Sequence, residues 1–249
     1  MGIGARIVEK WCIGAFRMIQ DTLPFTPHIQ RIGRFPAPDL LQQAQNRASD
    51  ADHWKYRVLD YLFICLAAPF VLPTLAIIAV WVKLDDPRSP VFYSQTRYGK
   101  NGRPFQILKV RTMVRGADQI KISLLAHSED KGPGFKLDND PRITRPGRSL
   151  RKLYLDELAQ FWNVFRGDMS LVGPRANSGD PAELEAWQRV RLLVRPGITG
   201  SWQIMRNKPR DFNQRCLIDL DYIARKSVWY DVTILLRTVL VVFVRPTGC

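Results

Sequence analysis

The sequence predicts an α+β fold, in which one apolar membrane helix precedes a small, mainly helical domain with a short β-hairpin. No charged residue occurs from Tyr61 to Val82, a stretch of 22 residues, and about 20 apolar residues suffice to span a bilayer. A strand-like run from Val91 to Gln95 is followed by a glycine-containing turn over 98–102, which is typical of a hairpin. Apolar residues recur at helical spacing in much of the remaining chain.

Composition limits the partners that this chain could bind. It has 249 residues, 46% of them hydrophobic, which is enough for one sizeable domain. The formal net charge of +14 indicates a polyanionic partner: nucleic acid, anionic phospholipid or a phosphorylated substrate. Aromatic and basic residues are not interleaved as in a nucleic-acid module, so we expect no nucleic-acid partner. The four cysteines have no pairing or metal-type spacing, and we expect free thiols in a reducing compartment.

Residues 1–52 are predicted to form an N-terminal extension. Apolar residues at loosely helical intervals in 1–20 suggest a short amphipathic helix, which either associates with the membrane or is a frayed or partner-bound terminus. The segment Thr22 to Asp39 holds four prolines and is typical of an extended linker. Leu40 to Asp50 is rich in Gln and Ala, which indicates a polar helix or coil.

The predicted membrane segment, residues 53–83, has two prolines near its middle. Pro69 and Pro73 each remove a backbone donor and clash with the preceding turn, so we expect the helix to break or kink there. Three structures compete: a straight span, a buried core helix, and a re-entrant hairpin that enters and leaves on one face. The prolines argue against the first and the length argues against the second.

Residues 84–249 should form the remaining domain. After the hairpin, helices are expected at Arg115 to His127, Pro181 to Val194 and Phe212 to Lys226, with a Gly-rich loop at Ser128 to Lys136. The second of these helices, rich in Glu and Arg, should lie on the surface. Tyr230 to Val244 is apolar and could be a second span, but Arg237 would then lie near its centre at a cost of a few kcal/mol.

Two adjacent carboxylates, Asp156 and Glu157, stand at the start of a predicted helix. Apolar side chains at helical spacing define one face of it: Leu155, Leu158, Phe161, Trp162 and Phe165. The first turn of a helix favours negative charge, and arginines and lysines bracket the pair. Taken alone, such a pair is more often a solvated acidic helix start than a catalytic site.

The sequence around this pair resembles the signature of the bacterial sugar transferases, the monotopic phosphoglycosyl transferases. The matching run is Leu-Asp-Glu-Leu-x-Gln-x-Trp-Asn-Val-x-x-Gly-Asp-Met-Ser-Leu-Val-Gly-Pro-Arg, from Leu155 to Arg175. Similarity extends from about Trp54 to the C-terminus. It implies a re-entrant membrane helix-hairpin, a catalytic domain at the cytoplasmic face and amphipathic interfacial helices, of which Tyr230 to Val244 would be one. The bend would lie at Ala68 and Pro69, where the family has Ser-Pro. A serine hydroxyl could satisfy a freed carbonyl there, whereas Ala68 cannot.

The resemblance also implies a reaction. Family members are polyprenyl-phosphate phosphoglycosyl-1-phosphate transferases, which move a phosphosugar from a UDP-sugar to undecaprenyl phosphate and release UMP. This is the first membrane step of exopolysaccharide, capsule or O-antigen synthesis. We therefore expect a UDP-sugar, undecaprenyl phosphate and anionic phospholipid as partners, at the cytoplasmic face of the bacterial inner membrane. A homodimer remains open.

Roles for individual residues follow from the same resemblance. Asp156 corresponds to the covalent nucleophile and Glu157 to a Mg²⁺ ligand. The basic residues that match phosphate- or substrate-binding positions are Lys109, Arg111, Arg151, Arg175 and Arg195, with Arg111 equally well explained as a solvated strand edge. Because nearby cations favour the charged carboxylate, we expect them to lower the pKa of Asp156.

A non-enzymatic role is the alternative. A basic membrane-anchored adaptor or nucleic-acid-binding protein would explain the charge and the apolar stretch. It would not explain why Asp156 and Glu157 occur together with the Gly-Pro-Arg segment that ends at Arg175.

Overall fold

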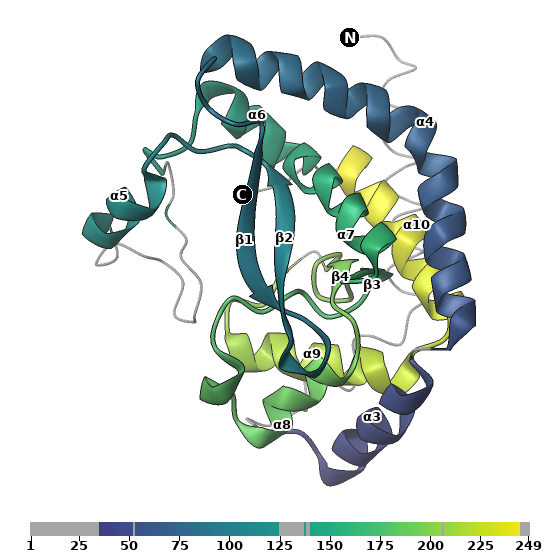
Figure 1. Cartoon of the computed structure of the whole chain (residues 1–249). Coiled ribbons are helices and arrows are strands. Elements are labelled where there is room, and N and C mark those ends of the chain that lie inside the picture. The colour runs from purple at the N-terminus through teal and green to yellow at the C-terminus, as the bar shows by residue number, and fades with distance from the viewer. Residues whose placement is uncertain (1–34, 52, 125–136, 138–139, 206, 245–249) are drawn as a thin grey trace, which may run out of the picture.

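The long helix α4, Trp54–Asp85, encloses the rest of the molecule on two sides (Figure 1). This computed structural model describes residues 35–51, 53–124, 137, 140–205 and 207–244. The helix predicted in residues 1–20, most of the Pro-rich linker and the loop at Ser128 to Lys136 lie outside these residues. The polar helix expected after the linker is confirmed as α3, Pro38–Asp50, and it packs against α9, Phe212–Arg225.

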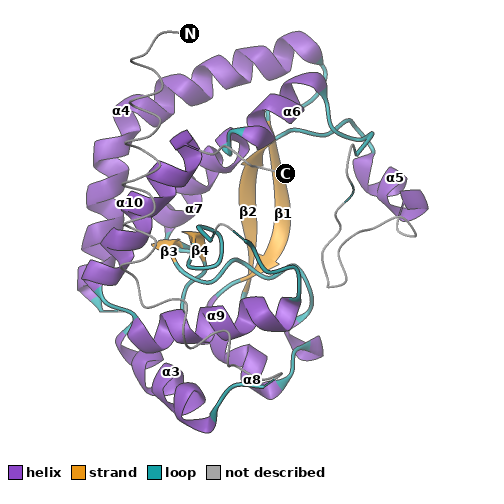
Figure 2. Cartoon of the chain, turned by 180° about the vertical axis from the view of Figure 1, so that it is seen from behind, coloured by secondary structure: helices purple, strands orange, loops and turns teal. Residues whose placement is uncertain are grey.

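Helix α4 is continuous over 32 residues although Pro69 and Pro73 lie inside it. The break that we considered does not occur. Instead, both ribbon views show the helix rising along one side and then turning across the top (Figures 1 and 2). The Thr74 hydroxyl donates a hydrogen bond to the Phe70 carbonyl at 2.7 Å, a contact that often bends a helix.

The surface of α4 is largely apolar and exposed. Among the described residues it is the one helix long and apolar enough to cross a membrane, and only 6% of its most apolar window is buried. Large side chains such as Leu66, Phe70 and Leu72 are more than half exposed. Its C-terminal part packs through Ile78 and Val82 in one apolar cluster with Val110, Leu150 and Ala159. The helix is therefore a candidate membrane anchor.

Near its N-terminal end, α4 is held by polar contacts. The Asp60 carboxylate, 2% exposed, accepts hydrogen bonds from the Ser170 hydroxyl and the Leu171 amide at 2.9–3.0 Å. Arg57 pairs with Asp60 at 3.3 Å and donates to the Val164 carbonyl at 3.2 Å. These contacts attach α4 to β3, Ser170–Val172, and to α7, Phe161–Arg166.

The predicted β-hairpin is confirmed and lies at the centre of the molecule (Figure 1). Strand β1, Phe92–Tyr98, pairs antiparallel with β2, Pro104–Val110, and Tyr93 lies opposite Lys109. Helix α5, Ala117–Leu124, confirms the helix expected at Arg115 to His127 as far as the described residues extend.

The acidic pair does not begin a regular α-helix as predicted. Helix α6, Arg145–Lys152, ends before Tyr154, whose positive φ of 58° interrupts the helical path. A 3-10 turn over Leu155–Gln160 then carries Asp156 and Glu157, and α7 follows it. The predicted apolar face is only partly in the core, because Trp162 and Phe165 are more than half exposed.

A second, parallel sheet was not predicted. Strand β3 pairs with β4, Gly197–Thr199, with Ser170 opposite Gly197. A side chain on Gly197 would collide with the backbone of Gly173, so glycine is required for this approach. The pairing places the Gly-Pro-Arg segment against the segment that contains Arg195.

Two helical predictions near the C-terminus have opposite outcomes. The surface helix expected at Pro181 to Val194 is wrong: this region contains short turns and α8, Ala186–Arg189, and Arg191 is buried. The helix expected at Phe212 to Lys226 is confirmed as α9. Helix α10, Val228–Val244, packs Ile234 in the core and leaves Trp229 and Leu236 exposed.

Candidate active site

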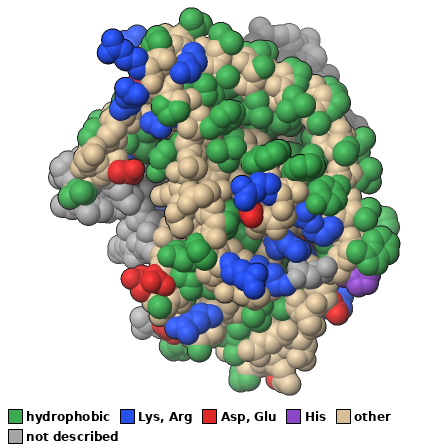
Figure 3. All heavy atoms as spheres, viewed as in Figure 1, with side chains coloured by type: hydrophobic (Ala, Val, Ile, Leu, Met, Phe, Trp, Pro, Cys, Tyr) green, Lys and Arg blue, Asp and Glu red, His purple; other side chains and the backbone are tan. Residues whose placement is uncertain are grey.

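A basic cavity of about 760 Å³ opens between the β-hairpin, the 3-10 turn and the loop that follows β3. On the face shown in Figure 3, lysine and arginine side chains form one group at the upper left and another to the right of and below the centre, and hydrophobic side chains cover much of the upper part and the right-hand edge. Ten charged residues line the cavity: Arg97, Lys109, Arg111, Asp118, Arg142, Arg151, Asp156, Arg175, Arg191 and Arg215. Eight of these ten are cations, so the cavity is suited to an anionic ligand.

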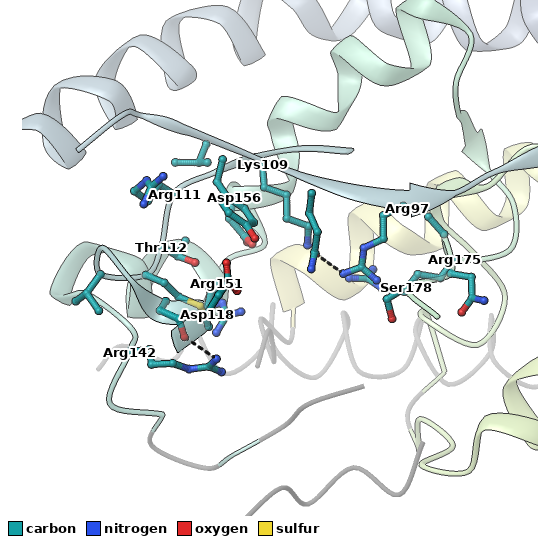
Figure 4. A pocket seen from close by; sticks show the side chains of 18 of the residues that line it. Arg97, Lys109, Arg111, Thr112, Asp118, Arg142, Arg151, Asp156, Arg175 and Ser178 are labelled. Atoms are coloured by element: carbon teal, nitrogen blue, oxygen red, sulfur yellow. Dashed lines mark hydrogen bonds between the residues drawn. The ribbon is translucent and has the colours of Figure 1, made fainter. Parts of the chain in front are cut away.

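Asp156 projects into this cavity from the 3-10 turn (Figure 4). The residue is 7% exposed, and its carboxylate has no hydrogen bond to any residue that the structure describes. Burial and the neighbouring Glu157 raise the pKa of Asp156, although the Lys109, Arg151 and Arg175 cations oppose the change. Our expectation of a lowered pKa is therefore wrong, because removal from water outweighs the cations.

Glu157 is fixed by two cations from different elements. Its Oε1 atom accepts from Lys109 Nζ at 3.2 Å and from Arg175 at 2.8 Å. Burial alone would raise the pKa of Glu157, but Arg175 and Lys109 outweigh it and hold the pKa at about 2. Lys109 comes from β2 and Arg175 follows β3, so one carboxylate joins the hairpin to the Gly-Pro-Arg segment.

The structure brings four of the five predicted basic residues to one cavity: Lys109, Arg111, Arg151 and Arg175. Arg151 lies on α6 near Asp156 (Figure 4). Arg111 donates through Nε to the Pro90 carbonyl at 3.0 Å, and its guanidinium lies 5.8 Å from the Tyr93 ring centroid. Arg111 therefore faces the cavity at its edge.

The fifth basic residue, Arg195, does not line this cavity. It lies with Arg57, Asp60 and Ser170 in a much smaller pocket beside α4, and its Nε donates to the Gly167 carbonyl at 3.1 Å. The substrate contact predicted for Arg195 stays a prediction. In the structure, the Arg195 side chain links the segment before β4 to the end of α7.

Several cavity residues were missed by sequence reasoning. Arg97 is one, and strand periodicity could have identified it, since alternate residues of β1 face the same side. Tyr93, Gln95 and Arg97 all line the cavity, as this alternation requires. No local signal marks the contributions of Trp202 and Phe212, which depend on how the C-terminal segments fold back.

The acidic pair suits Mg²⁺, which prefers one or two carboxylates together with substrate oxygens and water. The Oε2 atom of Glu157 has no hydrogen bond within the described structure, and neither has the Asp156 carboxylate. The described residues contain no group of three or more potential metal-ligating side chains, so a bound substrate would have to complete the coordination.

The comparisons with known proteins address the family directly. The model of a family described as bacterial sugar transferase matches residues 51–245. The chain belongs to the bacterial sugar transferase family. The family resemblance predicted from the sequence is thereby confirmed.

Relatives whose names state a function match over most of this chain. A galactosyl transferase, CpsE, from Streptococcus agalactiae is 47% identical over 73% of this chain and 39% of its own length. An undecaprenyl-phosphate galactose phosphotransferase from Salmonella typhimurium is 35% identical over 83% of this chain and 44% of its own length. The exopolysaccharide production protein ExoY of Rhizobium meliloti is 39% identical over 74% of this chain and 83% of its own length. The chain thus spans less than half the length of the first two.

Proposed function

We propose that this chain transfers a phosphosugar from a UDP-sugar to undecaprenyl phosphate, producing undecaprenyl-diphosphate-sugar and UMP. The observation that carries the proposal is a carboxylate, Asp156, that faces a strongly basic cavity and makes no hydrogen bond within the described structure. Names of relatives support the substrate class, since they include an undecaprenyl-phosphate galactose phosphotransferase and a UDP-glucose:undecaprenyl-phosphate glucose-1-phosphate transferase.

In the first step, a carboxylate oxygen of Asp156 attacks the phosphorus that carries the sugar. The bond from this phosphorus to the bridging oxygen breaks, and UMP leaves with the bonding electrons. Phosphoryl transfer depends mainly on positioning and electrostatic stabilisation. Lys109, Arg151 and Arg175 lie near enough to Asp156 to act on its charge and can neutralise the phosphate oxygens.

In the second step, an oxygen of the polyprenyl phosphate attacks the same phosphorus and displaces the carboxylate. The sugar diphosphate lipid forms, and Asp156 is restored for another cycle. A covalent intermediate separates the two substrates in time, so ping-pong kinetics are expected.

Mg²⁺ is the proposed cofactor, held by the free oxygen of Glu157 and by phosphate oxygens of the substrate. When bound, it would supply additional neutralisation of the diphosphate charge. Glu157 needs no deprotonation for this role, because its pKa of about 2 leaves it ionised at neutral pH. Lys109 and Arg175 orient the carboxylate through its other oxygen.

The lipid substrate requires a site at the membrane boundary. We propose that α4 is a re-entrant helix in the cytoplasmic leaflet of the bacterial inner membrane, with both ends facing the cytoplasm. Its exposed apolar surface and its bend support this arrangement (Figure 1). Anionic phospholipid would attract the basic face, with about 1 kcal/mol contributed by each cation near the surface. The exposed apolar side chains of α10 would contact the same interface.

Names of relatives indicate the candidate donors. Relatives are named for galactose, N-acetylgalactosamine and glucose transfer, so the UDP derivatives of these three sugars are the first donors to test. ExoY is named for exopolysaccharide production. The same initiating step would serve a capsule or O-antigen.

A UMP-release assay in a lipid bilayer tests the proposal. Purified chain in lipid nanodiscs is incubated with Mg²⁺ and each of a panel of UDP-sugars, first without and then with undecaprenyl phosphate. One donor should release UMP in an amount comparable to the protein before the lipid is added, and continuously afterwards. UMP that appears only with the lipid present would indicate direct transfer, and no UMP from any donor would refute the proposed activity.

The adaptor or nucleic-acid-binding alternative gains no support from the site. A binding surface does not require a carboxylate buried among cations with its oxygens left free of hydrogen bonds. Keeping Asp156 in this state is unfavourable, because burial opposes its ionised form. Such a cost is typical of catalytic groups.

A further inference from the structure

Arg97 extends from β1 into the cavity on the side away from Arg151 (Figure 4). In this view Arg97 lies next to Arg175 and Ser178, with Lys109 between them and Asp156. The cavity therefore offers cations on both sides of the proposed nucleophile.

Four of the cations that line the cavity are already paired with a carboxylate. Arg142 pairs with Asp140 at 2.6 Å, and Arg191 pairs with Asp219 at 2.7 Å. Lys109 and Arg175 share the single carboxylate of Glu157.

Arg97 differs from these cations. It forms no ion pair with any residue that the structure describes, and its hydrogen bond goes to the neutral Gln95 Oε1 atom at 2.8 Å. Its Nε atom is buried and has no acceptor among the described residues. A buried guanidinium donor without an acceptor is unfavourable, and a ligand oxygen would remove this cost.

The local electrostatics also favour an added anion. Burial, together with the nearby Arg175 cation, lowers the pKa of Arg97 to about 10. In this part of the cavity, Lys109, Arg97 and Arg175 carry three positive charges, whereas Glu157 and an ionised Asp156 supply two negative charges. A phosphate group would restore the balance.

We infer that Arg97 and Arg175 together bind a phosphate of the nucleoside diphosphate donor. The inference rests on the proposed function and adds a residue that neither the motif nor the resemblance assigned. Two guanidinium groups match phosphate geometry well, because each can donate two parallel hydrogen bonds to neighbouring oxygens.

Flat rings line the same cavity and would suit the base of a nucleotide. Arg191 donates to the Arg175 carbonyl at 2.9 Å, and its guanidinium lies 5.5 Å from the Phe212 ring centroid. Trp202 also lines the cavity, with the Arg215 guanidinium 5.4 Å from its ring centroid. Aromatic faces bind bases by stacking, so the Arg175 side is suited to a nucleotide rather than to a phosphate alone.

Binding of UDP and of inorganic pyrophosphate tests the inference without requiring turnover. Isothermal titration in nanodiscs with Mg²⁺ would compare the wild-type chain with Arg97→Gln and Arg97→Lys. Arg103→Gln is the matched control, since Arg103 is an exposed arginine of the same hairpin and does not line the cavity. Arg97→Gln should weaken both ligands about tenfold or more, the effect expected for one charge-assisted hydrogen bond. The affinities of Arg97→Lys should lie between those of the wild type and Arg97→Gln, and the affinities of Arg103→Gln should match those of the wild type.

Wild-type affinity for both ligands in Arg97→Gln would overturn the inference, as would an equal loss in Arg103→Gln. If circular dichroism shows that Arg97→Gln does not fold, the affinities of Arg97→Lys decide whether the inference holds. Lysine keeps the charge but loses the paired donors, so unchanged affinity would again overturn the inference. UMP release is judged separately. Weakened pyrophosphate binding with no UMP from any donor would refute the transferase and leave the phosphate subsite standing.

Discussion

Asp156 and Glu157 are adjacent in sequence, yet their carboxylates have opposite surroundings. Glu157 is joined to two cations, which keep its pKa low. Asp156 has no hydrogen bond within the described residues, and burial raises its pKa. Environments that separate the pKa values of two neighbouring acids also separate their roles. The structure thus distinguishes a carboxylate fixed by two cations from one whose oxygens accept no hydrogen bond within the described residues.

Replacing Asp156 with Asn should abolish turnover. The amide keeps the shape of the side chain but cannot act as the nucleophile, so no sugar phosphate should become attached to the protein. Mass spectrometry after incubation with the UDP-sugar alone measures this adduct. Asp39→Asn, at an exposed position in α3, serves as the control. Near-normal turnover by Asp156→Asn would eliminate this residue as the nucleophile.

Replacing Glu157 with Gln should lower kcat by about 100-fold or more, in line with the loss of one preorganised electrostatic contact in an active site. The change removes the charge that holds Lys109 and Arg175 together, and it weakens the proposed metal site. The rate should also need a higher Mg²⁺ concentration. Titration of the initial rate with Mg²⁺ measures both effects, and an unchanged Mg²⁺ dependence would exclude Glu157 as a ligand.

At the scale of elements, α4 has a bend whose cause can be tested. Pro69 and Pro73 remove two backbone donors, and Thr74 bonds back to the Phe70 carbonyl. This hydroxyl lies one residue after Pro73, and a hydroxyl that bonds to the carbonyl four residues back often bends a helix. Thr74 is thus a second contributor to the bend besides the prolines.

Replacing Pro69 and Pro73 together with Ala should allow α4 to straighten, because the missing donors return. Labelling of single cysteines should then reveal a population with its N-terminal side outside the cell. A Thr74→Val change in the wild-type background should have a smaller effect in the same direction, since the prolines remain. Unchanged topology in the double variant would show that neighbouring contacts set the bend.

The elements that sequence predicted well are those with strong local patterns. The apolar run of α4, the turn of the hairpin and the periodicity of α9 identify themselves without tertiary context. The strands β3 and β4 have three residues each, too few to show alternation, and their pairing joins segments far apart in the chain.

The residues of the candidate site that lie in a continuous sequence motif were predictable. Those that only the tertiary fold brings to the cavity were not. Asp156, Glu157 and Arg175 lie in one continuous run, and Lys109 in a second. Arg97 lines the cavity because of the side of β1 on which it lies. Trp202 lines it because the C-terminal part of the chain folds back over the hairpin side of the molecule. The raised pKa of Asp156 also escaped sequence reasoning, because burial cannot be read from neighbouring charges.

At the scale of the whole molecule, the central prediction is topological. Asp52→Cys and Asp85→Cys, at the two ends of α4 in an otherwise cysteine-free chain, should be equally protected from an impermeant reagent in intact cells. The basis is the bend in α4 together with basic residues on both flanks, which the positive-inside rule places on one side. Permeabilised cells provide the control for reactivity. Labelling of only the upstream position from outside would establish a straight span.

The buried Asp60 has a consequence for how deep the site lies. Its carboxylate fixes one turn of α4 to β3, and β3 leads directly into the segment that carries Arg175. Sliding α4 by one helical turn would displace it about 5.4 Å relative to the cavity, comparable to the size of a phosphate group. If α4 lies in lipid as proposed, the contact therefore fixes the distance between the apolar surface of α4 and the cavity that contains Asp156.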